Sequence, residues 1–403
     1  LVLMFGGASF ATALAFTLLF GVSNGLVTIM RGAVPLALFG PKGGTDSGND
    51  RKQEQSQAGD TAKPQLRMVR VRTGVSDGQW AELVDVDALD ANISAMTRWC
   101  SEHDVRLAPH VKTTMCRPIV ERQLAAGSST VTVATVSQAE TLVAWGCNDI
   151  LIANEVVDLG GLTTIRRVVD DPAIRIRCFL DSIDGLDVAQ QVFRDSGQWL
   201  EVLVDVGVPG GRTGVRETRV ALELCEAVAG APGLRLVGVA GYEGIVPNSR
   251  NSQALDAVDS HSLRTRDTFL AASSMFETAE PVFSMGGSAY PDRVVHWMPT
   301  DADVSGTVRV IRSGCYVTHD HGTYAQVSPI VGLEAALSVH AVVLSTPEPG
   351  MAILGAGRRD LPYDSGLPVL IAAASNCGTP IDGAEGRVRT LYDHHAVLDR
   401  LAS

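Results

Sequence analysis

The middle of the chain alternates between short apolar runs and amphipathic stretches. The runs are rich in β-branched residues and predict strands at 149–154, 175–181, 200–206, 234–241 and 281–287. Apolar residues at helical spacing lie between them, most clearly at 137–146 and 218–230. Strands that are apolar along their whole length and separated by helices indicate a parallel sheet buried on both faces. About 220 residues of this α/β alternation favour a (β/α)8 barrel, with a doubly wound sheet as the alternative.

The helical pattern fades after about residue 300. Apolar runs then predict strands of an antiparallel domain at 308–317, 337–345, 350–357 and 367–373. We therefore expect a barrel domain at 65–300, followed by a smaller β domain at 301–403.

The first 40 residues have a different pattern. Leu1–Val22 contains no charged residue, and as a helix it would span roughly 33 Å, close to the thickness of a bilayer core. The apolar stretch at 26–40 carries Arg31 and Pro35, so it is a poorer span. Residues 1–40 are thus predicted to be a hydrophobic, transmembrane-like helical segment.

A linker separates this segment from the rest of the chain. Residues 41–64 are polar and rich in Gly, Asp and Gln, which predicts disorder. The stretch at 21–40 resembles a helix pair from transporters of the major facilitator type, but two helices cannot form a transport path. Two explanations stay open: a fusion or gene-model join, and a genuine membrane anchor. The domain that follows is expected to be cytoplasmic, attached to a membrane only if residues 1–40 anchor it.

Charge and cysteine content exclude several other classes of protein. A net charge of −12 argues against a nucleic-acid partner, because phosphate binding needs clustered cations. The seven cysteines form no CxxC pair, which indicates reduced thiols rather than a zinc knuckle or a disulfide framework. We expect most of them to be small core residues.

The segment RLAPHVKTT (106–114) carries the first candidate chemistry. A short apolar strand would place His110 and Lys112 at its C-terminal end, on one side, because strand side chains alternate. That end is the active-site face of a barrel. A partly desolvated lysine there can attack an aldehyde. Taken alone, the pattern also fits an ordinary surface lysine.

The sequences of the segments at 107–127 and 131–157 closely resemble those of the D-threonine aldolase and D-serine dehydratase family. The resemblance runs from about Leu83 to the end of the chain. It implies a pyridoxal 5'-phosphate (PLP) enzyme with an alanine-racemase-like barrel. The family's P-H-x-K-T motif implies that Lys112 holds PLP, with His110 beside it.

A second motif, VDVGVPGGRTGV (204–215), resembles the family's D-x-G-x-G-R-x-G-V turn with one extra residue. The resemblance implies that Arg212 hydrogen-bonds the pyridine nitrogen of PLP. An arginine there keeps this nitrogen unprotonated and makes the cofactor a weaker electron sink. The alternative is a glycine-rich turn with a surface arginine.

A third motif, FSMGGSAYPD (283–292), is expected to bind the phosphate of PLP. Its position resembles the family's phosphate loop, where backbone N–H groups and a hydroxyl can hold an anion. The predicted contacts are Gly286, Gly287, Ser288 and Ala289.

Three further residues are assigned by resemblance. Tyr242, in AGYEG, matches a family tyrosine that contacts the cofactor. Tyr316 is expected to line the active site at a dimer interface, and His395 to lie near it. A homodimer is implied only by the resemblance.

The family implies a divalent metal, but its S-H-x-C/D-P motif is absent here, so the β domain is predicted to be truncated and no metal ligand is assigned. His319, Asp320 and His321 look like a metal cluster, although polar loop residues are the favoured interpretation. Without the metal half-site we expect weak or no lyase activity, with PLP binding retained.

These observations together predict a PLP-dependent lyase acting on D-3-hydroxy amino acids. The reaction would be retro-aldol cleavage or loss of the β-hydroxyl, as in D-serine or D-threonine type dehydratase-deaminases. The sequence at 313–320 slightly favours the dehydratase or deaminase reaction. The alternatives are an amino-acid racemase, which would need a second base, a catalytically impaired PLP-binding protein, and a membrane transporter fragment based on residues 1–40 alone.

Overall fold

The computed structural model describes residues 80–363, 366–374, 380–381 and 384–400. The predicted transmembrane-like segment (1–40) and linker (41–64) lie outside this part of the chain. Within it, no helix has the length and apolarity needed to cross a membrane.

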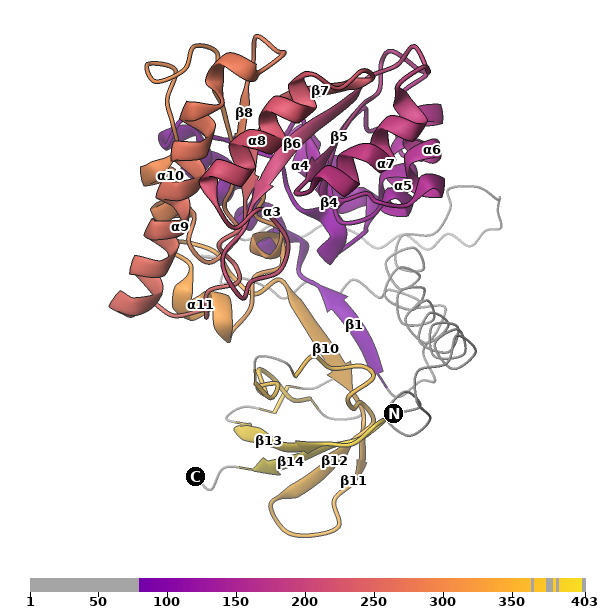
Figure 1. Cartoon of the computed structure of the whole chain (residues 1–403). Coiled ribbons are helices and arrows are strands. Elements are labelled where there is room, and N and C mark those ends of the chain that lie inside the picture. Colours follow the sequence, from indigo (N-terminus) through magenta and orange to yellow (C-terminus); the bar gives the residue numbers. More distant parts are fainter. Residues whose placement is uncertain (1–79, 364–365, 375–379, 382–383, 401–403) are drawn as a thin grey trace, which may run out of the picture.

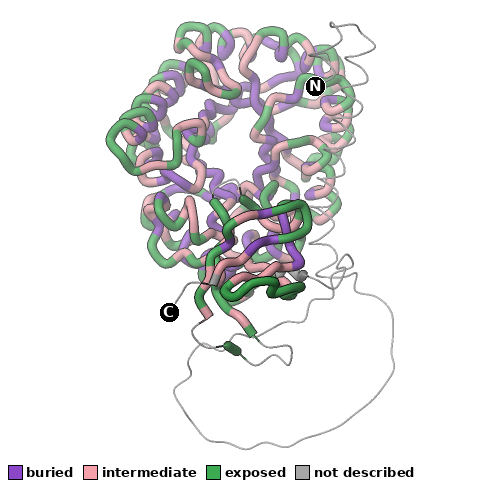
Figure 2. Tube along the Cα trace, turned by 90° about the horizontal axis from the view of Figure 1, so that it is seen from below, coloured by how far each residue is buried: buried purple, intermediate pink, exposed green. Residues whose placement is uncertain are grey.

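Eight parallel strands form a closed barrel, in the order β2-β9-β8-β7-β6-β5-β4-β3. The two ends of this sheet meet where His110 bridges Thr132, whose N–H donates to the carbonyl of Pro109 over 2.9 Å. Figure 2 shows the ring that the strands and their helices make. The predicted (β/α)8 barrel is therefore confirmed. The strands are β2 (Arg106–Leu107), β3 (Val131–Val133), β4 (Asp149–Glu155), β5 (Arg175–Leu180), β6 (Leu200–Val206), β7 (Leu234–Gly241), β8 (Val282–Ser284) and β9 (Val308–Ile311).

The apolar strand sequences are explained by two cores, one on each side of the sheet. Leu203 points into the barrel, while its neighbours Val202 and Val204 pack outward against the helices. The inner cluster also contains Phe179 and Val237. Because side chains alternate across a strand, a strand buried on both faces is apolar at every position.

A helix follows each of the first seven barrel strands. Polar side chains fix where several of them begin: the carboxylate of Asp158 accepts from the N–H of Gly161 over 2.6 Å, and the hydroxyl of Thr135 accepts from that of Gln138. Helix α3 (Val86–Glu102) precedes the barrel and packs against β2. The other helices are α4 (Arg117–Ala125), α5 (Val136–Ala144), α6 (Leu159–Val168), α7 (Ile183–Phe193), α8 (Thr218–Ala229), α9 (Ser252–Ala271), α10 (Pro291–Trp297) and α11 (Thr323–Val327).

A smaller antiparallel sheet lies below the barrel in Figure 1. Strand β1 (Trp80–Val84) pairs with β10 (Leu337–Ala341), and this two-stranded ribbon lies between the two domains. The sheet order is β11-β12-β14-β13. Its strands are β11 (Val343–Ser345), β12 (Met351–Leu354), β13 (Gly386–Leu391) and β14 (Ala396–Arg400).

Two predicted strands were wrong. The run at 308–317 is not part of the antiparallel domain, because Val308–Ile311 is the parallel strand β9 between β2 and β8. The run at 367–373 forms no strand, only an isolated bridge from Val369 to Arg387. Its exposed apolar residues pack into no buried cluster, so nothing holds them as a strand.

Candidate active site

The predicted site residues gather where barrel strands end. Lys112 follows β2, Arg212 follows β6, Tyr242 follows β7, and the loop at 286–289 follows β8. The C-terminal ends of parallel barrel strands open on one face, which is where barrel enzymes place their catalytic groups. Residues remote in the sequence thus meet at one mouth.

The alternation of side chains predicted that Lys112 lies at the end of a strand, and this was wrong. β2 ends at Leu107, and Lys112 lies in the short 3-10 helix η1 (Val111–Thr113). The alternation argument therefore does not apply. The structure nevertheless brings His110 and Lys112 together. Because the two residues are close, the charge of Lys112 contributes to the lowered pKa of His110.

Lys112 is surrounded by other cations. Its side chain is exposed at the mouth, but the protein around it removes enough water to lower the pKa of its ammonium group. The nearby guanidinium groups of Arg212 and Arg312 lower this pKa further. A lysine in such a place has more of the neutral amine that reacts with a carbonyl.

His110 is held as a neutral imidazole. Burial lowers its pKa to about 2, with smaller effects from the charges of Lys112 and Arg312. Its N–H donates to the carbonyl of Ser313 over 3.1 Å, which fixes the backbone. Its ring Nδ1 is buried without a partner among the described residues. A buried nitrogen of this kind can bind a group brought by a ligand.

A neighbouring arginine holds the loop that carries Arg212. The guanidinium of Arg216 donates to the carbonyls of Thr213 and Gly214 over 2.6 and 2.7 Å. It also donates to the carbonyl of Arg212 over 2.8 Å. With its backbone fixed, Arg212 extends over the ring of Tyr242, with Cζ 4.9 Å from the centroid. This is cation–π geometry, and it brings two predicted site residues together.

The loop after β8 differs from the prediction at its two glycines. The N–H of Gly287 donates to Oε1 of Glu243 over 2.6 Å, and the N–H of Gly286 donates to Oε2 over 3.2 Å. These two N–H groups were predicted to bind phosphate, but a buried carboxylate already accepts from them. A buried N–H needs an acceptor, and Glu243 supplies one inside the protein.

Other donors of the same loop stay free. No described protein group accepts from the N–H of Ser288 or of Ala289. The hydroxyl of Ser288 lies 2.7 Å from that of Ser313. An anion could therefore bind to these two amides and to the hydroxyls of Ser288 and Ser313.

Sequence reasoning missed the residues that follow β9. The guanidinium of Arg312 is buried, donating to Oγ of Ser284 over 2.6 Å and to the carbonyl of Gly241 over 2.7 Å. Cys315 lies near Lys112, with Sγ 4.0 Å from Oγ1 of Thr113. The alternating sequence at 308–311 could have placed Arg312 and Cys315 after a barrel strand, if this run had been assigned to the barrel.

A pair of buried carboxyl groups lies at the same end of the barrel. Burial and the charge of Glu155 raise the pKa of Asp205 to about 7. The hydroxyl of Thr213 donates to Oδ2 of Asp205 over 3.0 Å. Burial also raises the pKa of Glu155, and the nearby charge of Asp181 raises it further.

Two predicted lining residues lie elsewhere. Tyr316 is buried in the core beside α4, where its hydroxyl accepts from Nε2 of Gln123 over 2.8 Å. Successive residues of a 3-10 helix point about 120° apart, so Cys315 and not Tyr316 faces Lys112. His395 is exposed between β13 and β14. The structure gives neither residue a contact with Lys112.

The described residues do not fit a metal site. They contain no group of three His, Cys, Asp or Glu side chains able to hold an ion. In the loop at 319–321, Oδ1 of Asp320 accepts from the N–H groups of Gly322 and Tyr324 over 3.0 and 2.8 Å. This carboxylate therefore shapes a polar loop.

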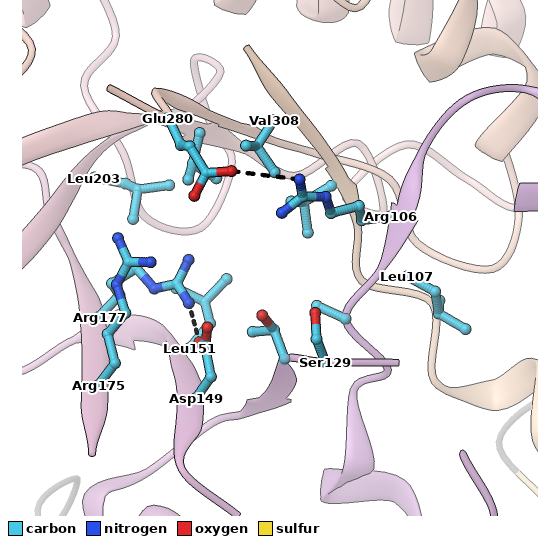
Figure 3. Close-up of a pocket in the computed structure, with 14 residues that line it drawn as sticks. Arg106, Leu107, Ser129, Asp149, Leu151, Arg175, Arg177, Leu203, Glu280 and Val308 are labelled. Carbon is cyan, nitrogen blue, oxygen red and sulfur yellow. Dashed lines mark hydrogen bonds and ion pairs between the residues drawn. The ribbon is translucent and has the colours of Figure 1, made fainter. Parts of the chain in front are cut away.

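A cavity of about 110 Å³ lies at the opposite end of the barrel, among the first residues of the strands. Figure 3 shows its charged lining: Arg106 faces Glu280, and Arg177 pairs with Asp149. Arg175 also contacts Glu201 over 2.5 Å. Three arginines oppose three carboxylates, so this end is charge-balanced and suits a structural role.

PLP fits the groups at the C-terminal mouth. Lys112 offers an amine to an aldehyde, and the free amides of Ser288 and Ala289 suit a phosphate. Arg212 is a cation held in a fixed place, and Nδ1 of His110 lacks a partner among the described residues. These features match the aldehyde, the phosphate and the polar ring substituents of this cofactor.

Two protein families match the chain. The family described as "Alanine racemase, N-terminal domain" matches residues 84–295, and "Putative serine dehydratase domain" matches residues 336–402. The first covers the barrel from α3 into α10, without its last strand β9, and the second covers the antiparallel sheet.

Curated relatives match over most of their length. D-threonine aldolase from Arthrobacter sp. is 29% identical over 309 residues, 76% of this chain and 79% of that protein. D-threo-3-hydroxyaspartate dehydratase from Delftia sp. (strain HT23) is 29% identical over 296 residues, 71% and 73% of the two chains. The crystal structure of D-threonine aldolase from Filomicrobium marinum superposes with a TM-score of 0.67, at 29% identity over 80% and 82% of the chains.

Proposed function

Because this chain belongs to the alanine racemase N-terminal domain family, we propose that it is a PLP-dependent lyase acting on D-3-hydroxy amino acids. The observation that carries the proposal is the position of Lys112, an amine with a lowered pKa among the cations of the barrel mouth. The similarity to lyases of D-3-hydroxy amino acids supports the substrate class.

Several of the predicted site residues have a role in this proposal, whereas Gly286 and Gly287 donate to Glu243. Lys112 holds PLP covalently, and Arg212 contacts the pyridine nitrogen. Ser288 and Ala289 bind the phosphate through their free amides. Tyr242 packs beneath Arg212 and keeps its guanidinium in place.

PLP, when bound, stabilises the negative charge that develops on the substrate. In a dehydratase reaction, Lys112 takes the α-proton, because its lowered pKa makes the neutral amine available as a base. His110 stays neutral and acts as a polar neighbour rather than as an acid. Arg212 offers a cation to the substrate or cofactor without giving up a proton.

The two lyase reactions give different products. Retro-aldol cleavage of D-threonine yields glycine and acetaldehyde, whereas dehydration of D-3-hydroxyaspartate yields a keto acid and ammonia. The relatives include an aldolase and a dehydratase at equal identity. The purified chain should be given both substrates with PLP, and glycine and ammonia should be measured. Release of neither product, together with no PLP binding, would contradict the proposed function.

We infer that the chain works as a homodimer. Val369, Ile371 and Ile381 of the β domain are each at least half exposed. Exposed apolar side chains on one small domain suit an interface with a second copy. Size-exclusion chromatography with light scattering measures the assembly, and Ile371→Ser should lower the dimer fraction.

A further inference from the structure

The carboxylate of Glu243 is fully buried behind the loop at 286–289. It follows β7, while the loop follows the neighbouring strand β8. One carboxylate oxygen accepts from Gly287 and the other from Gly286, over 2.6 and 3.2 Å. Burial raises the pKa of Glu243, while the N–H groups of Gly287 and Gly286 lower it. Both oxygens act as acceptors, as in an ionised carboxylate, and the contact ties the two strand ends together.

The other side of the loop is fastened to β9. The N–H of Arg312 donates to the carbonyl of Gly286 over 2.7 Å. Gly286 has φ +107°, and a Cβ at this position would lie 2.9 Å from Cγ2 of Ile311. Only glycine fits this close approach with this backbone. The loop is therefore held from two sides, by Glu243 and by the chain after β9.

We propose that Glu243 is the positioning residue of the phosphate-binding loop, an inference that rests on the proposed function. By accepting from Gly286 and Gly287, the carboxylate directs those two amides into the protein. The next two amides, of Ser288 and Ala289, are left for a ligand, beside the hydroxyls of Ser288 and Ser313. Glu243 itself does not touch the phosphate, which a carboxylate would repel.

The test compares PLP with pyridoxal, which lacks the phosphate. In Glu243→Gln one carboxylate oxygen becomes an NH2 group, so one loop N–H faces a donor instead of an acceptor. We expect the affinity for PLP to fall by about tenfold and the affinity for pyridoxal to stay unchanged. Dissociation constants of the full chain are measured by absorption titration, with no need for turnover. A merely structural role would lower both affinities together.

Glu277→Gln is the matched control. The Glu277 carboxylate also accepts from a backbone N–H, that of Leu236 near the start of β7, over 3.1 Å, far from the loop at 286–289. Glu277→Gln should leave the ratio of the affinities for PLP and pyridoxal the same as in the parent. If Glu243→Gln does not fold, Gly287→Ala decides instead, since its Cβ would lie 3.2 Å from Oε1 of Glu243 and disturb the same contact.

Two outcomes separate the inference from the proposed function. A parent that prefers PLP to pyridoxal, with an unchanged preference in Glu243→Gln, overturns the role of Glu243 alone. A parent that binds neither compound overturns the proposed function and this inference with it.

Discussion

The guanidinium of Arg212 lies over the ring of Tyr242, with Cζ 4.9 Å from the ring centroid. The pair joins the loop after β6 to the end of β7, and Arg216 holds the backbone of Arg212 from behind. The charge of Arg212 thereby stays close enough to Lys112 to lower its pKa.

Arg212→Met should move the reaction of Lys112 with PLP to higher pH. Removing a nearby cation favours the ammonium form, so the pKa of Lys112 rises and the neutral amine forms only at higher pH. The affinity for PLP should also fall by about tenfold. The rate of covalent attachment, measured against pH, checks the first effect. Arg235→Met is the control, because Arg235 stacks on Trp199 with Cζ 4.6 Å from its ring. An unmoved midpoint in Arg212→Met would contradict the assignment.

Lys112→Ala should abolish covalent attachment of PLP. No other amine is assigned to the cofactor, so the visible absorption of lysine-bound PLP should disappear, and borohydride reduction should leave the protein mass unchanged. Lyase turnover should fall by at least about a hundredfold, the typical contribution of a positioned base. A parent-like band in the variant would show that another lysine holds the cofactor.

His110 should contribute to the loss of stability in acid. Its pKa in the folded protein, about 2, lies below the ordinary value for histidine. The unfolded chain therefore takes up a proton that the folded chain refuses once the pH falls below about 6.5, and stability declines from there downward. Urea unfolding at about pH 7.5 and about pH 5.5 should show this decline reduced in His110→Gln. An equal decline in the parent and in His110→Gln would contradict this role of His110.

Arg177→Met should destabilise the barrel without affecting PLP. The Arg177 side chain is 6% exposed and pairs with Asp149 (Figure 3). Both residues line the cavity at the end of the barrel opposite Lys112. Breaking a buried pair leaves a charge without its partner, at a cost of about 3 kcal/mol in the free energy of unfolding. Arg219→Met removes an exposed pair with Glu223 and should cost at most about 0.5 kcal/mol. Equal losses in the two variants, read from urea denaturation, would contradict the structural role of this end.

The barrel could be predicted from the sequence because its strands are apolar on both faces. The runs at 200–206 and 234–241 match β6 and β7 at both ends. At the end of β9, Arg309 and the following Arg312 flank the apolar pair Val310 and Ile311, and this mixture is typical of an edge strand. Arg312 is tolerated because Ser284 and the carbonyl of Gly241 satisfy its donors inside the barrel, which no local pattern reveals.

The site was predictable only where chemistry follows a local motif. Lys112 and Arg212 were found in their motifs, and the structure places both at one mouth. Glu243 was missed, because its importance comes from pairing with Gly286 and Gly287 on another strand. Tyr316 was assigned to the site by resemblance, and its direction in the 3-10 helix Cys315–Val317 cannot be read from the sequence.

The β1–β10 ribbon has a consequence for the order in which the chain is made. β1 leaves the ribosome before any barrel strand, whereas its partner β10 is synthesised after all eight. Until β10 is made, β1 lacks its partner strand, and an unpaired strand edge can pair with other chains. Closing the ribbon is a late and non-local step, so the union of the two domains depends on a barrel that has already formed. A pause in translation between α10 and β10 would prolong the interval in which that edge is vulnerable.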